Sequence, residues 1–137
     1  MSRRSGFTLI ELMIVVIILA ALAGMVLPRL LDHADKAKGY IAKADIASIT
    51  TALKLYKINN GSYPSASDGG LNALMTVPSS AKNWKGPYLE NQPIDPWGRK
   101  YNYKYPGSHN PTSFDIWSDG VDQGNAEDDI NNWDNKR

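Results

Sequence analysis

A run of twenty residues from Thr8 to Leu27 contains one charged side chain, Glu11, and it limits what this chain can fold into more than any other feature. A helix rises 1.5 Å per residue, so the run would span roughly 30 Å, about the thickness of the hydrocarbon core of a bilayer. This length predicts a membrane-spanning helix. An ordinary secretory signal peptide is the alternative, since Ala21-Leu22-Ala23 could serve as a cleavage site, but signal peptides have a shorter apolar run.

The apolar run also predicts the orientation of the chain. Arg3 and Arg4 precede it, and a positive flank stays in the cytoplasm, so the C-terminal part is sent outward. We therefore expect residues 1–6 to be a leader, residues 7–31 to be the membrane segment, and residues 32–137 to form an extracytoplasmic head domain.

The first half of the head, residues 32–60, is predicted to continue the same helix. Pro28 cannot donate a backbone hydrogen bond, so the helix should bend or loosen there rather than end. Apolar residues then recur at spacings of three and four, which is typical of an amphipathic helix laid against a domain. These residues are Ile46, Ile49, Leu53 and Tyr56. Asn59-Asn60-Gly61 is the expected end of the helix.

Residues 61–117 are rich in turn formers and carry the signals of a small sheet. A short helix is expected over residues 71–77, begun by Ser67 or Asp68. Tyrosines alternate with polar residues in 97–105, which indicates a half-buried strand, and residues 113–117 are its expected antiparallel partner. The predicted fold class is α+β, with one long N-terminal helix packed on a small antiparallel sheet and followed by a C-terminal acidic loop.

Composition excludes several kinds of activity. The chain has no cysteine, so disulfides and thiolate chemistry are absent. Residues 115–137 hold seven acidic and two basic side chains, which argues against nucleic acid binding there. His33 and His109 are the only histidines, and neither suggests a triad or a zinc site. An enzyme tethered to the membrane, with Asp128 and Asp129 as paired carboxylates for acid-base chemistry, is a weak hypothesis, because the sequence shows no histidine to partner them.

The segment Gly6-Phe7-Thr8-Leu9-Ile10-Glu11 resembles the cleavage motif of type IV pilin-like precursors. The resemblance implies that a prepilin peptidase cuts after Gly6 and methylates the new N-terminal Phe7. It also implies that the Glu11 carboxylate pairs inside the membrane with the Phe7 amine of a neighbouring subunit and sets the register of a filament. A membrane-embedded carboxylate costs about 2.5–3.5 kcal/mol on insertion scales, so it calls for such a reason. The alternative is that Glu11 reaches the headgroups near the helix end.

Blocks along the head resemble the major pseudopilin of the type II secretion system. In order they are Tyr56-Lys57-Ile58-Asn59-Asn60-Gly61-Ser62-Tyr63-Pro64, Gly70-Leu71-Asn72-Ala73-Leu74, Gly86-Pro87-Tyr88-Leu89, Asp95-Pro96-Trp97-Gly98, Ser118-Asp119-Gly120-Val121-Asp122 and Asp128-Asp129-Ile130-Asn131-Asn132-Trp133. The resemblance implies a pilin-like fold. It also implies a structural subunit of the pseudopilus, a helical periplasmic filament that helps export folded proteins. A type IV pilin of surface fibres, for adhesion or motility, is the alternative.

The same resemblance implies a calcium site in the segment 118–137. Side-chain ligands would come from Asp122, Asp128 and Asp129, and the Asp119 position would contribute a backbone oxygen. Calcium prefers six to eight oxygen ligands, and a bound cation would relieve the repulsion between these carboxylates. A solvated acidic loop without metal is the alternative reading.

The resemblance further implies the surroundings of the protein. The precursor would sit in the inner membrane with its N-terminus in the cytoplasm, and the processed chain would join the periplasmic pseudopilus. Its partners would be other copies of itself, minor pseudopilins, the prepilin peptidase, and an inner-membrane assembly platform with a cytoplasmic ATPase, since this chain has no phosphate-binding loop of its own.

Overall fold

One long helix forms the framework of the computed structural model, which describes residues 6–134. This helix, α1 (Leu9–Asn60), has 52 residues and continues through Pro28 without interruption. Contacts divide the chain into two units, Met1–Lys36 and Ala37–Arg137. The predicted continuation of the helix past Pro28 is confirmed, whereas a bend at that position stays a prediction.

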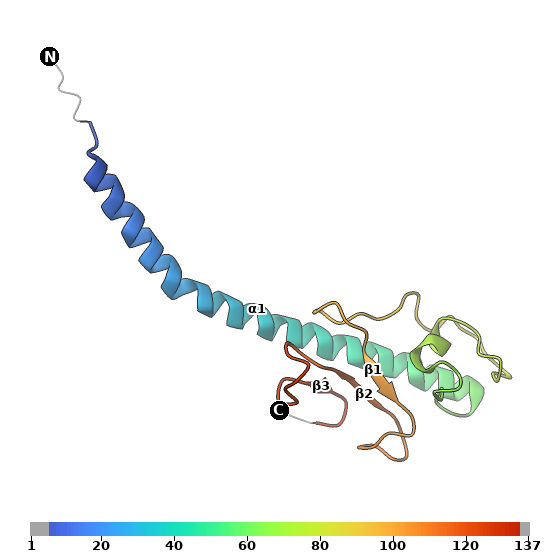
Figure 1. Cartoon of the computed structure of the whole chain (residues 1–137). Helices are drawn as coiled ribbons and strands as arrows, with labels where there is room; N and C mark the ends of the chain where they lie inside the picture. Colours follow the sequence, from blue (N-terminus) through green and yellow to red (C-terminus); the bar gives the residue numbers. More distant parts are fainter. Residues whose placement is uncertain (1–5, 135–137) are drawn as a thin grey trace. The chain divides into compact units, whose positions relative to one another are not determined.

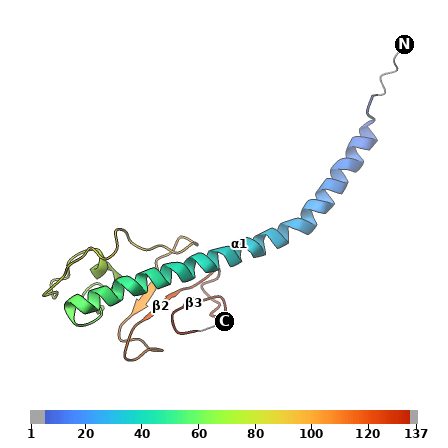
Figure 2. The same ribbon diagram turned by 180° about the vertical axis from the view of Figure 1, so that it is seen from behind.

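The head half of α1 is amphipathic, as its sequence period predicts. Its buried residues are Ala42, Ile46, Ile49, Ala52, Leu53 and Tyr56. The strands lie along this half of the helix and on one side of it (Figure 1), and the view from behind shows the same arrangement (Figure 2). Burial of a large aliphatic side chain stabilises the fold by about 1.5–3 kcal/mol, so Ile49 and Leu53 are main contributors to the core.

The helix ends where the sequence predicts. Asn60 is its last residue, and Gly61 has a φ of 88°. The Gly61 amide donates a hydrogen bond of 2.7 Å to the carbonyl oxygen of Lys57 and so satisfies one of the last helical carbonyls. Glycine adopts this left-handed conformation at no steric cost, which explains its place after the helix.

The sheet has three antiparallel strands in the order β1-β2-β3. β1 (Asn102–Lys104) pairs with β2 (Asp115–Ser118), with Tyr103 opposite Ile116. β2 also pairs with β3 (Ile130–Asn131), so β2 is the central strand. The predicted pair is confirmed. β1 is shorter than the predicted 97–105, since the turn at residues 95–98 precedes it and Pro106, which cannot donate to a ladder, follows it.

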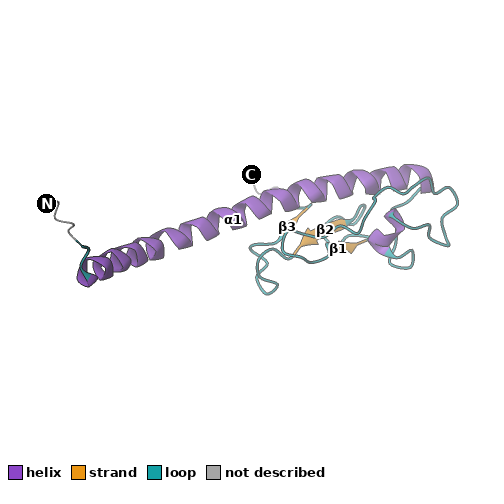
Figure 3. Ribbon diagram, turned by 90° about the horizontal axis from the view of Figure 1, so that it is seen from above, coloured by secondary structure: helices purple, strands orange, loops and turns teal. Residues whose placement is uncertain are grey.

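The short helix between α1 and the sheet differs from its prediction in type, in its start and in its end, which is at Leu74 rather than at residue 77. It is a 3-10 helix, η1 (Gly70–Leu74), and its N-cap is Gly69, with no side-chain cap. Ser67 and Asp68 do not cap it. Asp68 instead accepts hydrogen bonds from Ser65 and Ser80, which tie together the loop on either side of η1. Figure 3 shows η1 beside the sheet, next to the last turns of α1.

Two tyrosine hydroxyls of the β1 region fix the sheet to the elements around it. The Tyr101 hydroxyl donates to Asp45 Oδ2 on α1 at 2.8 Å, and the Tyr103 hydroxyl donates to the carbonyl oxygen of Pro64 at 2.8 Å. Burial raises the pKa of both phenols well above the ordinary value, so they remain protonated donors. The alternating tyrosines therefore hold the sheet against the helix and the loop that follows it.

Candidate functional site

The residues of the predicted cleavage site lie at the start of α1. Gly6 and Phe7 precede the helix, and the Phe7 side chain is 86% exposed. Arg3 and Arg4, the predicted positive flank, lie outside the described residues. An exposed, non-helical Gly6-Phe7 junction is a form of backbone that a peptidase can reach.

Thr8 and Glu11 form a reciprocal cap at the first turn of α1. The Thr8 amide and hydroxyl both donate to Glu11 Oε2 at 2.9 Å, and the Glu11 amide donates to Thr8 Oγ1 at 3.3 Å. This is a capping box, which satisfies helix-end donors that have no partner within the helix. Glu11 therefore has a role within its own chain in addition to the predicted pairing with a neighbour. The spacing Thr-x-x-Glu is the sequence signal that could have revealed it.

The first six turns or so of α1 present apolar side chains that their own chain does not cover. From Phe7 to Leu31 the large apolar residues are exposed, and Val15, the least exposed of them, is 46% accessible. By length and composition α1 is one helix that could cross a membrane, and the apolar window that qualifies it has no buried residue. This exposed apolar surface is consistent with the predicted membrane segment, residues 7–31.

The acidic loop connects β2 to β3 and turns sharply at Gly120. This residue has a φ of 64°, and a Cβ added to it would lie 2.9 Å from Asp128 Oδ2 and still closer to the Asp128 carbonyl oxygen. Glycine is required here for conformation and for space. The two ends of the loop are thereby brought against each other, with Asp128 packed on Gly120.

Asp128 is the predicted ligand whose position best suits a cation. Its Oδ2 accepts hydrogen bonds from the amides of Val121 at 2.8 Å and Asp122 at 2.9 Å. Its Oδ1 is buried and has no hydrogen-bond partner among the described residues. A buried carboxylate oxygen without a partner is costly, and a cation would satisfy it. Asp128 therefore fits the predicted role.

The other three predicted ligands are placed differently. Asp119 Oδ1 accepts hydrogen bonds from Asn102 Nδ2 at 2.9 Å and from Trp117 Nε1 at 3.1 Å, so this side chain already serves the sheet. That arrangement agrees with the implied use of a backbone oxygen at this position. Asp122 is exposed, with Oδ1 accepting from the Gly124 amide at 3.0 Å, and Asp129 is half-buried at the end of the loop.

The four carboxylates are not gathered as a preformed cluster. Within residues 6–134, no group of three or more acidic, histidine or cysteine side chains is close enough to hold a metal. A cation at Asp128 would thus draw on carbonyl oxygens and water or on movement of the loop, which calcium tolerates because its coordination is flexible. The fit of the loop to calcium rests on Asp128.

A buried carboxylate outside the predicted set anchors the start of the loop. Asp95 Oδ1 accepts hydrogen bonds from the amides of Trp97 at 3.1 Å and Arg99 at 2.8 Å, and Oδ2 accepts from Ser118 Oγ at 2.6 Å. The Gly120 amide in turn donates to Ser118 Oγ at 3.3 Å. The sequence patterns did not indicate this link between the turn at residues 95–98, where Gly98 has a φ of 85°, and the acidic loop.

The far end of the loop is held by a second buried carboxylate and an aromatic stack. Asp115 accepts hydrogen bonds from the amides of Ser108, His109 and Asn110. Burial alone would raise the pKa of Asp115, but the donors from His109 and Asn110 outweigh it and hold the pKa below its ordinary value. The turn that is built in this way places the His109 ring on Trp133, just beyond β3.

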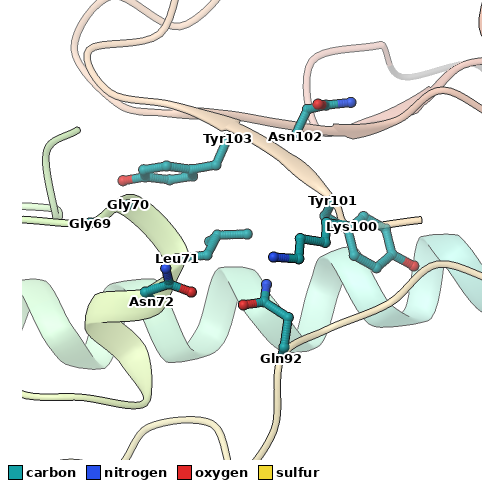
Figure 4. Close-up of a pocket in the computed structure, with 9 residues that line it drawn as sticks. All are labelled: Gly69, Gly70, Leu71, Asn72, Gln92, Lys100, Tyr101, Asn102 and Tyr103. Carbon is teal, nitrogen blue, oxygen red and sulfur yellow. The ribbon is translucent and has the colours of Figure 1, made fainter. Parts of the chain in front are cut away.

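A shallow cavity of about 280 Å³ lies elsewhere on the head, between η1 and β1 (Figure 4). Lys100, Gln92 and Asn72 contribute polar side chains to it. Asn102 also lines this cavity and is the residue that donates to Asp119. None of the predicted site residues lines it.

Comparisons with known proteins match both the N-terminal segment and the head of the chain. A family model described as "Type II secretion system (T2SS), protein G" matches residues 29–133, and one described as "Prokaryotic N-terminal methylation motif" matches residues 1–27. The chain is 48% identical to the type II secretion system core protein G of Pseudomonas aeruginosa, over 97% of both chains. It is 41% identical to that of Vibrio cholerae, over 97% of this chain and 94% of the relative.

A solved structure gives the same result. The crystal structure of the major pseudopilin from the type 2 secretion system of enterohaemorrhagic Escherichia coli matches with a TM-score of 0.66 at 34% identity. The match covers 77% of this chain and 95% of that one. The expected pilin-like α+β fold, with one long helix on a small antiparallel sheet, is confirmed.

Proposed function

Because this chain belongs to the type II secretion system protein G family, we propose that it is a structural subunit of the pseudopilus that assembles into a helical periplasmic filament and helps export folded proteins. The family is one of structural pseudopilin subunits, which leaves the tethered-enzyme hypothesis without support. The type IV pilin alternative is less specific, since the family match extends over the head at residues 29–133.

The observation that carries the filament proposal is the uncovered apolar surface of α1. Side chains such as Leu9 and Met25, which are 77% and 72% exposed, have no cover from their own chain. Apolar surface of this extent is covered in the mature protein either by lipid or by other proteins. Helices of neighbouring copies provide the second kind of cover, because the same helix in each copy is equally apolar.

A further face of α1, on its head half, supports contacts between copies. Tyr40, Leu55 and Ile58 are 72%, 48% and 76% exposed, on the side of the helix that faces away from the sheet. Tyr40 and Ile58 are separated by eighteen positions, which is five turns of a helix, so they project in the same direction. We assign this face to contacts with neighbouring subunits.

The filament proposal is tested by placing a charge on this face. Ile58→Asp should abolish sedimenting filaments in cells that express the secretion system, while the melting temperature of the head stays unchanged. Val77→Asp is the matched control, because Val77 is also apolar and 61% exposed but lies outside α1. Normal filaments with Ile58→Asp, or equal loss with both variants, would contradict the assignment.

We further propose that the precursor is cut after Gly6 and methylated on Phe7 by a prepilin peptidase. The match to the N-terminal methylation motif over residues 1–27 and the exposed junction support this. Intact-mass spectrometry of the chain, with and without the peptidase, measures both events. A product that begins at Phe7 and carries one added methyl group is expected, whereas an unchanged mass would reject the processing.

The intermolecular role of Glu11 can be separated from its capping role. Glu11→Gln retains a side chain that capping boxes also use, but it removes the charge that would pair with the Phe7 amine of a neighbour. Thr8→Ala does the reverse. We expect Glu11→Gln to reduce filament formation more than Thr8→Ala, by immunoblot of sheared fractions. The opposite order would show that capping is the main role of this carboxylate.

We also propose that the acidic loop binds calcium, with Asp122, Asp128 and Asp129 as side-chain ligands and a backbone oxygen from Asp119. The partnerless buried Oδ1 of Asp128 is the supporting observation. A bound divalent cation would supply positive charge to a loop of like charges and hold its two ends together, and its binding free energy would add to folding.

Calcium binding is tested by melting the full chain in detergent with calcium or with chelator. Saturation at a hundredfold over the dissociation constant stabilises by about 2.7 kcal/mol, so a higher melting temperature is expected with calcium. Asp128→Asn should abolish this difference, and Glu127→Gln, an exposed acidic neighbour, should not. Equal melting of the wild type in both solutions would reject the site.

We finally propose that the precursor is an inner-membrane protein with a cytoplasmic N-terminus and a periplasmic head. Minor pseudopilins and an assembly platform with a cytoplasmic ATPase would be its partners. Protease added to spheroplasts tests the orientation, since it should digest the head while the apolar half of α1 stays protected. A head that is digested only after the membrane is broken would reverse the proposed orientation.

A further inference from the structure

We propose that Arg99 is a positioning residue that serves as a built-in cation of the acidic loop and holds the loop's first turn in place when no metal is bound. The inference rests on the proposed calcium site and concerns the state of that site before calcium arrives. It is carried by the contacts of Arg99, which lies 21 positions before Gly120 and outside the loop.

The turn at residues 95–98 aims Arg99 at the loop. Its backbone amide donates to Asp95 Oδ1 at 2.8 Å, which fixes the main chain. Its Nε lies 3.8 Å from Asp95 Oδ2, and its side chain is 25% exposed. The guanidinium Nη2 then donates a hydrogen bond to the carbonyl oxygen of Gly120. Both ends of Arg99, backbone and side chain, are therefore held.

These contacts close a ring around the start of the loop. Asp95 accepts from Ser118 Oγ, which accepts from the Gly120 amide, and the Gly120 carbonyl accepts from Arg99, whose amide returns to Asp95. Gly120 is thus bound at both its amide and its carbonyl. Because Asp128 packs against the same residue, a fixed Gly120 also sets where the Asp128 carboxylate lies.

The charge of Arg99 suits this position. The loop brings Asp119, Asp122 and Asp128 into a short segment, and without a counter-charge their repulsion favours an open loop. The guanidinium brings positive charge as part of the chain itself, whereas a metal must bind to supply one. Arg99 supplies a permanent positive charge on the sheet side of the loop, where calcium would supply an exchangeable one.

A merely structural role for Arg99 makes a different prediction. If the side chain served only to stabilise the turn at residues 95–98, its removal would loosen that turn and leave the loop unaffected. If Arg99 positions the loop, its removal loosens residues 119–129 in metal-free protein, and calcium restores them. Amide hydrogen exchange separates the two roles because it reports each segment on its own.

The experiment is hydrogen exchange with mass spectrometry on the full chain in detergent, in chelator and in saturating calcium. Arg99→Gln should raise exchange in peptides that cover 119–129 by about tenfold in chelator, the expected effect of losing a hydrogen bond to a charged group. Saturating calcium should return the rate to that of the wild type. Lys100→Gln is the matched control, since it removes the same charge one position later from an exposed side chain.

Loop exchange in Arg99→Gln at the wild-type rate in chelator would overturn the inference, as would an equal effect of Lys100→Gln. If Arg99→Gln also speeds exchange in the helix around Ile49 and Leu53, the fold has loosened as a whole, and the comparison uses Arg99→Met, which keeps most of the apolar stem and removes the charge. Faster exchange confined to the loop in Arg99→Met then supports the positioning role, and an unchanged loop overturns it. If loop exchange in the wild type is the same in calcium and in chelator, the calcium proposal is rejected. The comparison of wild type and Arg99→Gln in chelator still decides the role of Arg99.

Discussion

The imidazole of His109 lies flat against the indole of Trp133, with ring centroids 4.1 Å apart and ring planes 2° apart. Trp117 completes the cluster, with its ring centroid 5.7 Å from that of Trp133 and the two ring planes 66° apart. The stack joins the turn after β1 to the segment after β3, so it holds the C-terminal end of the acidic loop. The hydrogen bonds among Asp95, Ser118, Gly120 and Arg99 hold the N-terminal end of the same loop.

His109→Ala should therefore release the C-terminal segment. Aromatic pairs contribute about 0.5–1.5 kcal/mol beyond the area they bury, so we expect a loss of about 1 kcal/mol in unfolding free energy. Exchange at residues 130–133 should rise as well. Thr112→Ala, an exposed change in the same turn, is the control for denaturant melts. Equal losses in the two variants would show that the stack contributes nothing.

Asp115 should make the stability of the head depend on acid. Its folded pKa is lowered, so its contribution is complete above the ordinary aspartate pKa of about 3.9 and is lost as the pH falls from there through the folded pKa. We expect urea unfolding of the wild type to weaken below about pH 4. In Asp115→Asn this part of the pH dependence should be absent, with lower stability at pH 7. Glu90→Gln is the exposed control. An unchanged acid slope in Asp115→Asn would contradict the assignment.

Tyr101→Phe should weaken the attachment of the sheet to α1. The substitution removes the hydroxyl that donates to Asp45 and leaves the carboxylate with one partner fewer, at an expected cost of about 1.5–3 kcal/mol. Tyr105→Phe is the matched control, since its ring packs on the same core. Chemical denaturation measures both, and similar losses would mean that the hydroxyl of Tyr101 is unimportant.

Gly120→Ala should disrupt the acidic loop. The added methyl group would collide with the Asp128 carbonyl. The φ of 64° at this position is also unfavourable for residues other than glycine. Strain of this kind costs on the order of 1–3 kcal/mol. Gly124→Ala tests the same change within the same loop, where the nearest atom to an added Cβ is 3.6 Å away. Loss of stability with Gly120→Ala alone, by thermal melting in chelator, is the expected result. Two variants of equal stability would contradict the tight approach of Asp128 to Gly120.

Local patterns predicted the parts of this fold that local interactions determine. The buried face of α1 follows from the spacing of Ile46, Ile49 and Leu53, and the end of the helix follows from Gly61. β1 was predicted from the alternation around Tyr103, which extends beyond the hydrogen-bonded residues, and residues 113–117 were predicted as its antiparallel partner. The capping box at Thr8 and Glu11 is equally local and was available in the sequence.

Features that depend on distant partners were not predictable in the same way. β3 has two residues, and the side chain of Asn132 continues its pairing by accepting from the Ile116 amide and donating to the Phe114 carbonyl. Ser67 or Asp68 was predicted to begin the short helix because serine and aspartate are common N-cap residues, but Asp68 accepts hydrogen bonds from Ser65 and from Ser80, twelve positions later. In the acidic loop, the family resemblance indicated which carboxylates could bind a cation. The fold adds that, among the loop carboxylates within residues 6–134, Asp128 is the one with a buried oxygen that has no hydrogen-bond partner.

The uncovered apolar half of α1 has a consequence for how a subunit changes environment. Lipid tails and the flanks of neighbouring helices are similarly apolar, so passage from a bilayer into a bundle of helices changes the hydrophobic free energy of this surface little. Whether the helix favours the bilayer or the bundle then depends on smaller free-energy contributions, such as close packing between helices and the few polar groups on the helix. Glu11 is one of these polar groups, and one oxygen of its carboxylate, Oε2, has hydrogen-bond donors from Thr8 of its own chain.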